Sequence, residues 1–210
     1  MDVHPRPVRS AALVLLLCAA ALLAAPRGAV ADAIVGQPAP AFTLTGTDGK
    51  PHSLSEYAGK LVVLEWFNHD CPFVRKHYGS GNMQKLQKKW TGQGVVWLSI
   101  NSSAPGKQGN YPPEEANELT KEKGAAPTAV LLDPDGTVGR AYGAKTTPHM
   151  FVVDPKGELI YAGGIDDKPS TDPADVASAR NHVDQALTEA IAGKPVTVAT
   201  STPYGCSVKY

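Results

Sequence analysis

The chain has 210 residues, enough for one domain with extensions, and 42% hydrophobic and 19% charged residues give it an ordinary globular composition. Basic and acidic residues number 20 each, so the formal net charge is zero. This balance excludes the strongly basic surface that binds nucleic acid or anionic membranes. The 20 glycines and 18 prolines predict many turns.

The first 31 residues have the pattern of a secretory signal peptide. Arg6 and Arg9 precede an unbroken apolar run at 11–25, and small residues follow at 29–31. A basic start, an apolar core and an A-x-A end predict cleavage, so the mature chain is expected to begin near Asp32 and to be periplasmic or secreted. A membrane anchor is the alternative, but a span usually takes about 20 apolar residues.

Cleavage there would remove Cys18 and leave two cysteines, Cys71 and Cys206. A lipid anchor on Cys18 is disfavoured because Leu17 is bulkier than a lipoprotein signal normally allows before its cysteine. Disulfides persist in exported proteins, so one structural bridge between the two remaining cysteines is the simplest expectation.

The rest of the chain predicts an α/β domain at 32–194. In chain order the pattern predicts a hairpin (41–54), a buried strand (61–67), a helix (72–90, interrupted at 79–81), a strand (94–100), a helix (114–123), a strand (128–132), a short helix (138–142), a hairpin (149–162) and a last helix (173–192). Residues 195–210 form a tail that is too polar to be a core element. Strands that alternate with helices and then form a hairpin favour a mixed sheet.

The main chemical signal is the segment Glu65-Trp-Phe-Asn-His-Asp-Cys71-Pro72. Cys71 lies where a buried strand gives way to a helix, and Pro72 suits the first helical position. Backbone amides and the helix dipole stabilise a thiolate there, with pKa values of about 3.5–7.5 at such sites. Cys71 is therefore a candidate nucleophile, and a buried structural cysteine is the alternative.

An acidic residue six positions before a Cys-Pro helix start, together with Lys145-Thr-Thr-Pro148 before an apolar strand, resembles the thioredoxin superfamily. The resemblance implies the thioredoxin fold, a mixed central sheet flanked by helices, here with an N-terminal hairpin extension. It also implies that Thr147-Pro148 is a cis peptide facing Cys71.

Two further segments are similar to one branch of that superfamily. They are Tyr111-Pro-Pro-Glu-Glu115, preceded by Asn101-Ser-Ser, and Thr202-Pro-Tyr-Gly-Cys206-Ser-Val-Lys-Tyr210. The branch contains bacterial redoxin and peroxiredoxin-like proteins of the alkyl hydroperoxide reductase/thiol-specific antioxidant type. It implies a thiol-dependent oxidoreductase or antioxidant protein that acts on protein or small-molecule thiols and disulfides, or on peroxides, without a cofactor.

The sequence departs from both known motifs at the cysteine. Val74 stands where thioredoxins have the second cysteine of Cys-x-x-Cys, so Cys206 is the candidate resolving cysteine. Leu64 and Asn68 stand where peroxiredoxins have proline and threonine, so the peroxide-binding hydroxyl is absent at that register.

Besides the two cysteines, the sequence offers five candidate site residues, and Glu65 is the first of them. The resemblance gives Glu65 the place of the buried acid that shuttles protons, and desolvation on an apolar strand should raise its pKa. A surface-facing or salt-bridged carboxyl is the alternative. Asn68, Pro72 and Thr147 are candidates for substrate binding, and Pro148 is grouped with the catalytic residues.

No metal is expected. His69 and His77 flank Cys71 and His149 follows Pro148, but no cysteine or histidine pair has metal-ligand spacing. The leading hypothesis is an exported thiol–disulfide oxidoreductase. A thiol peroxidase, a binding domain stapled by one structural disulfide and a copper-binding chaperone are the alternatives. The sequence leaves open the substrate, the electron donor, the direction of transfer and the oligomeric state.

Overall fold

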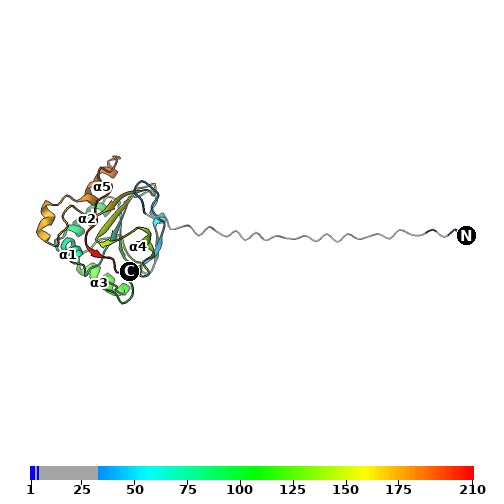
Figure 1. The fold of residues 1–210 in the computed structure, drawn as a ribbon, viewed down its shortest axis with the longest axis horizontal. Helices are drawn as coiled ribbons and strands as arrows, with labels where there is room; N and C mark the ends of the chain where they lie inside the picture. The colour runs from blue at the N-terminus through cyan, green and yellow to red at the C-terminus, as the bar shows by residue number, and fades with distance from the viewer. Residues whose placement is uncertain (3, 5–32) are drawn as a thin grey trace.

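A computed structural model describes residues 1–2, 4 and 33–210 (Figure 1). The predicted signal peptide therefore falls almost entirely outside the described residues. Seven strands form one sheet in the order β2-β1-β5-β4-β3-β7-β8. The strands are β1 (Thr43–Gly46), β2 (Pro51–Ser53), β3 (Val62–Trp66), β4 (Val96–Asn101), β5 (Ala129–Leu132), β7 (His149–Val153) and β8 (Leu159–Gly163). β3, β4 and β5 are parallel, and the other neighbours pair antiparallel.

The helices cover both faces of this sheet. They are α1 (Pro72–Gly79), α2 (Asn82–Thr91), α3 (Pro113–Glu122), α4 (Thr137–Ala141) and α5 (His182–Ile191), with 3₁₀ turns η1 (Leu54–Tyr57) and η2 (Pro173–Ser178). α1, α2 and α5 pack on one face, and α4 packs on the other (Figure 1). This arrangement confirms the predicted thioredoxin fold.

The central strands are buried on both faces, as their apolar runs predicted. Val63 points toward α1, α2 and α5, whereas Leu64 and Trp66 point toward α4. Because side chains alternate along a strand, Glu65 shares the face of Val63 and lies under the α1–α2 layer. The predicted N-terminal hairpin is present as β1–β2, and β1 joins the sheet beside β5.

The prediction of a single last helix at 173–192 is wrong. The chain forms the 3₁₀ turn η2, extends through Ala179–Asn181, and starts α5 at His182. The Asn181 side chain accepts a hydrogen bond from the Asp184 amide at 2.8 Å and so caps the new helix. Asn181 also pairs with Asp166 in an isolated bridge, and the His182 amide donates to the Ile165 carbonyl. Tertiary backbone pairing therefore interrupts the helical pattern.

The tail is more structured than its polarity suggested. Cys206–Ser207 forms β9, which pairs antiparallel with β6 (Thr146–Thr147), so that Thr147 lies opposite Cys206. Val196, Tyr204 and Cys206 pack against the core as partly buried side chains. The tail, red in Figure 1, thus crosses the domain surface instead of hanging free. Among the described residues, no helix has both the length and the apolar character to cross a bilayer.

Candidate active site

Cys71 is held between the end of β3 and the start of α1. It is the N-cap residue of α1, and Pro72 occupies the first helical position, as predicted. The preceding loop is fixed by Asn68, whose Oδ1 accepts from the Asp70 amide at 2.9 Å and whose Nδ2 donates to the Gln108 carbonyl at 3.1 Å. Both polar ends of the Asn68 side chain are therefore engaged in shaping the loop, and only 2% of the residue is exposed.

The sulfur of Cys71 is buried, with 0% of the residue exposed. It lies 3.0 Å from the carbonyl oxygen of Thr147 and 2.7 Å from the Sγ of Cys206, although the two cysteines are 135 positions apart. The Thr147–Pro148 peptide is cis, as the resemblance implied. The structure therefore brings together Cys71, Cys206 and the Thr147–Pro148 turn.

The two sulfurs differ in acidity. Burial alone would raise the pKa of Cys71, but hydrogen bonds that include those from Cys206 and from the Val74 amide outweigh it and leave the pKa lowered. Burial raises the pKa of Cys206 to about 11, with help from the hydrogen bond and the charge of Cys71. Of the two sulfurs, Cys71 therefore has the lower pKa.

Close backbone packing brings Cys206 to this position. Gly205 has a φ of +140°, and a Cβ there would overlap the Thr147 carbonyl oxygen. Only glycine allows the tail to approach the Thr147–Pro148 turn so closely. After β9, the Val208 amide donates to the Lys145 carbonyl and the Ala104 amide donates to the Lys209 carbonyl.

Glu65 is fully buried under the site. It accepts hydrogen bonds from Tyr78 (2.9 Å), Gln87 (3.2 Å), Trp97 (2.8 Å) and Ser99 (2.8 Å). Burial raises the pKa of Glu65 in spite of these four donors, which act in the opposite direction. The expectation of a desolvated carboxyl is therefore met, and Glu65 neither faces the surface nor forms a salt bridge with any described residue. None of its hydrogen bonds within the described chain reaches Cys71.

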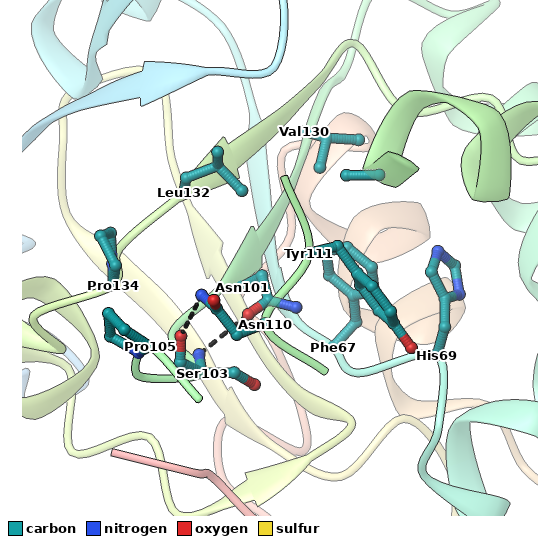
Figure 2. Close-up of a pocket in the computed structure, with 11 residues that line it drawn as sticks. Phe67, His69, Asn101, Ser103, Pro105, Asn110, Tyr111, Val130, Leu132 and Pro134 are labelled. Atoms are coloured by element: carbon teal, nitrogen blue, oxygen red, sulfur yellow. Dashed lines mark hydrogen bonds between the residues drawn. The ribbon is translucent and has the colours of Figure 1, made fainter. Parts of the chain in front are cut away.

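A cavity of about 240 Å³ lies beside the loop that precedes Cys71. Figure 2 shows Phe67, His69 and Tyr111 at one end and Pro105 and Pro134 at the other. The lining is mainly apolar.

The three histidines near the site are buried. Burial lowers the pKa of His69, His77 and His149 to about 4 in each case, so all three are neutral at pH 7. Among the described residues, no group of three or more histidine, cysteine, aspartate or glutamate side chains could hold a metal ion.

Sequence reasoning missed a buried polar cluster behind α1, which we call the Asp166 cluster: Lys76, His77, Asp166 and Tyr204. Asp166 Oδ2 lies 3.9 Å from both Lys76 Nζ and His77 Nε2, and these three side chains are almost completely buried. The hydroxyl of Tyr204 donates to Asp166 Oδ1 and lies 3.2 Å from His77 Nε2. The tail motif contains Tyr204, but nothing in the local pattern indicates its distant partner Asp166.

Comparisons with known proteins agree with this geometry. A family model described as the AhpC/TSA family matches residues 35–162, more than half of the chain. The thiol-disulfide oxidoreductase ResA of Geobacillus kaustophilus is 30% identical over 126 residues, which cover 60% of this chain and 66% of ResA. The selenocysteine-containing peroxiredoxin PrxU of Peptoclostridium acidaminophilum is 33% identical over 134 residues, which cover 59% of this chain and 64% of PrxU.

Among solved structures, an uncharacterized conserved protein from Geobacillus kaustophilus is similar with a TM-score of 0.72 and 26% identity. The match covers 84% of this chain and 92% of that protein, so it includes most of the domain described above. The curated relatives, in contrast, are matched over only about two thirds of their length.

Proposed function

Since this chain belongs to the AhpC/TSA family, we propose that it is a thiol–disulfide oxidoreductase that cycles Cys71 and Cys206 between a dithiol and a disulfide. The observation that carries the proposal is the 2.7 Å approach of the two sulfurs across 135 positions. The similarity to ResA supports the same chemistry.

The environment of the pair suits exchange. A thiolate is the attacking species in thiol–disulfide chemistry, and the lowered pKa of Cys71 favours one. Val74 occupies the place of a local second cysteine, so the resolving sulfur has to come from elsewhere. Cys206 meets that requirement because the tail pairs with Thr147.

The other candidate residues receive supporting roles in this proposal. Pro72 starts the helix whose Val74 amide bonds the Cys71 sulfur, and the Thr147 carbonyl of the cis Thr147–Pro148 peptide lies 3.0 Å from that sulfur. Asn68 holds the loop that precedes Cys71. Glu65, whose pKa is raised by burial, is the proposed proton donor and acceptor for the pair.

The proposed location is the periplasm or the exterior of the cell, based on the pattern of residues 1–31. The partners are protein or small-molecule thiols and disulfides, and neither a nucleic acid nor a stable membrane insertion is part of the proposal. The intact mass of the exported product tests the location. A product that retains residues 1–31 would contradict cleavage.

A redox titration of the native protein tests the proposed activity. Cys71 and Cys206 should form a disulfide that millimolar dithiothreitol reduces without unfolding, and the oxidised protein should accept electrons from thiols. Cys206→Ser is the matched control, since it keeps Cys71 but should abolish the reversible bond. A bridge that resists dithiothreitol in the folded protein would instead indicate a structural staple.

A thiol peroxidase is the second candidate, because PrxU is among the relatives and Cys71 is a buried cysteine with a lowered pKa. Asn68 stands where the peroxide-binding hydroxyl belongs, and its amide is already committed to the loop. Peroxide consumption would separate the two candidates, since a peroxidase passes through a sulfenic acid on Cys71. Peroxide turnover as fast as disulfide exchange would favour the peroxidase.

A further inference from the structure

The two sulfurs of the pair are not equally accessible. Cys71 has no exposed surface, and Cys206 lies over it from the tail. Cys206 itself is partly exposed. A thiolate attacks a disulfide along the line of the bond that breaks, so it approaches the attacked sulfur from the side opposite the leaving sulfur. An approach to the Cys71 sulfur from any side therefore passes through packed protein, whereas the partly exposed Cys206 can be approached from solvent.

The ability of each sulfur to leave also favours attack on Cys206 over attack on Cys71. Attack on Cys206 would release Cys71, whose thiolate is stabilised by the Val74 amide. Attack on Cys71 would release Cys206, whose pKa is raised by burial. The sulfur with the lower pKa leaves faster, so access and leaving-group ability both favour attack on Cys206.

The charge around Cys206 also suits an incoming thiolate. The positive charge of Lys209 acts to lower the pKa of Cys206, so it lies close enough to attract an anion to that sulfur. Lys209 is partly exposed and its ammonium donates to the neighbouring Ser207 hydroxyl at 3.3 Å. It is held on the tail itself, beside the sulfur under attack.

We propose that Cys206, carried on the tail, is the sulfur that exchanges with the partner thiol, and that Cys71 is the internal sulfur that closes and opens the pair. This inference rests on the proposed function and reverses the order suggested by the sequence, in which Cys71 meets the substrate and Cys206 resolves.

The exchange proceeds in two balanced steps. A partner thiolate attacks Cys206 Sγ, the Cys71–Cys206 bond breaks, and its electron pair leaves on Cys71 as a thiolate. The partner is then joined to Cys206 in a mixed disulfide. A second partner thiolate attacks the partner sulfur and releases a partner disulfide, and Cys206 takes a proton. The protein gains two electrons and the thiols lose two, and the reverse sequence reduces a partner disulfide.

Peptide mapping of the trapped intermediate tests this order. The oxidised native protein is mixed with 2-mercaptoethanol, quenched with acid at short times and mapped by mass. The adduct is expected on Cys206, with Cys71 as the free thiol. An adduct on Cys71 would overturn the inference and leave the proposed function standing. Failure of the untreated protein to form a Cys71–Cys206 bond at all would count against the proposed function itself.

Single-cysteine variants give a second measurement that does not depend on accumulation of the adduct. Reduced Cys71→Ser and Cys206→Ser proteins are treated with 5,5′-dithiobis(2-nitrobenzoate), and circular dichroism verifies the fold of each. Each rate is measured across pH and divided by the thiolate fraction that its own profile gives, because the two cysteines differ in pKa. The Cys206 thiolate in the first variant should then react at least roughly tenfold faster than the Cys71 thiolate in the second, where the tail still covers the Cys71 sulfur. Equal rates, or a faster Cys71, would contradict the assignment.

Discussion

The tail is attached to the domain on both sides of Cys206, and the two attachments differ in chemistry. Before the cysteine, Tyr204 inserts its hydroxyl into the buried Asp166 cluster. After it, Tyr210 packs against α4, where a Cβ on Gly136 or Gly139 would overlap its ring, and Arg140 lies 4.5 Å from the ring centroid. The first attachment depends on buried charge, and the second depends on shape and one exposed cation.

This difference predicts which attachment controls the sulfur pair. Lys76 and His77 belong to α1, the helix that Cys71 caps, so the Asp166 cluster links the tail directly to the element that positions Cys71. The Tyr210 attachment links the tail to the opposite layer. Damage to the Asp166 cluster should therefore affect both stability and the Cys71–Cys206 pair, whereas damage at Tyr210 should affect mainly the chain end.

The largest effect is expected from Asp166→Ala. The substitution leaves the buried Lys76 ammonium without its counter-charge, and removing one partner of a buried ion pair costs about 3–5 kcal/mol. Denaturant unfolding of the reduced protein measures the loss.

Asp167→Ala is the matched control for Asp166→Ala. Asp167 is an exposed neighbour whose carboxylate accepts from the Arg180 backbone amide. Asp167→Ala should lower the free energy of unfolding clearly less than Asp166→Ala does. Equal losses in the two variants would mean that the buried charges contribute nothing specific.

The next effect is a pH dependence to which the Asp166 cluster contributes through His77. Burial lowers the pKa of His77 from 6.5 to about 4. Between these two pH values the imidazole binds a proton in the unfolded chain but stays neutral in the folded protein. The stability associated with His77 is complete above pH 6.5 and is lost as the pH falls toward 4, by up to about 3 kcal/mol. The positive charge of Lys76 and the carboxylate of Asp166 both face this imidazole and act on its pKa in opposite directions.

His77→Gln isolates this contribution, because His69 and His149 carry the same shift and Glu65 titrates in the opposite sense in both proteins. The free energy of unfolding of His77→Gln should fall less steeply than that of the native protein between pH 7 and 4.5. Parallel curves would show that His77 titrates at its ordinary pKa in the folded state.

Local signals predicted the half of the site that lies close in sequence. The strand that carries Glu65 and the helix start at Cys71 follow from an apolar run and from the position of Pro72, whereas the cis Thr147–Pro148 peptide was implied by the family resemblance. The structure has all three. The contacts between distant segments were harder to predict from the sequence. Asp166 and Tyr204 come from loops with no regular pattern, and the break before His182 arises from backbone pairing with Ile165 and Asp166.

The proposal that Cys206, and not Cys71, exchanges with the partner thiol could not be reached from the sequence for a similar reason. The helix start makes Cys71 the more acidic cysteine, and this much follows from the sequence. Its burial depends on where the tail lies, which is decided by Gly205 fitting against Thr147 and by the two tyrosine attachments. Acidity is a local property here, whereas access is set by the whole fold.

A smaller effect is expected from Tyr204→Phe. The ring would stay beside Phe73 and under Lys76, but Asp166 and His77 would each lose a hydrogen-bond partner. Such a loss costs about 1–3 kcal/mol when the remaining group is buried. Because Tyr204 lies two residues before Cys206, closure of the disulfide should also slow, which stopped-flow oxidation of the dithiol would detect. Unchanged closure would uncouple the Asp166 cluster from the sulfur pair.

The smallest effect is expected from Tyr210→Phe, the counterpart substitution on the other side of Cys206. The Tyr210 hydroxyl donates to the Ala144 carbonyl at 2.8 Å, and its removal should cost about 0.5–1.5 kcal/mol. The ring would still fill the space left by Gly136 and Gly139 and would still face Arg140, so the path of the tail should be kept. The rate of disulfide closure should therefore match that of the native protein in the same stopped-flow assay. If Tyr210→Phe slowed closure as much as Tyr204→Phe, the two attachments would be equivalent, and the link through α1 would not be what positions Cys206 over Cys71.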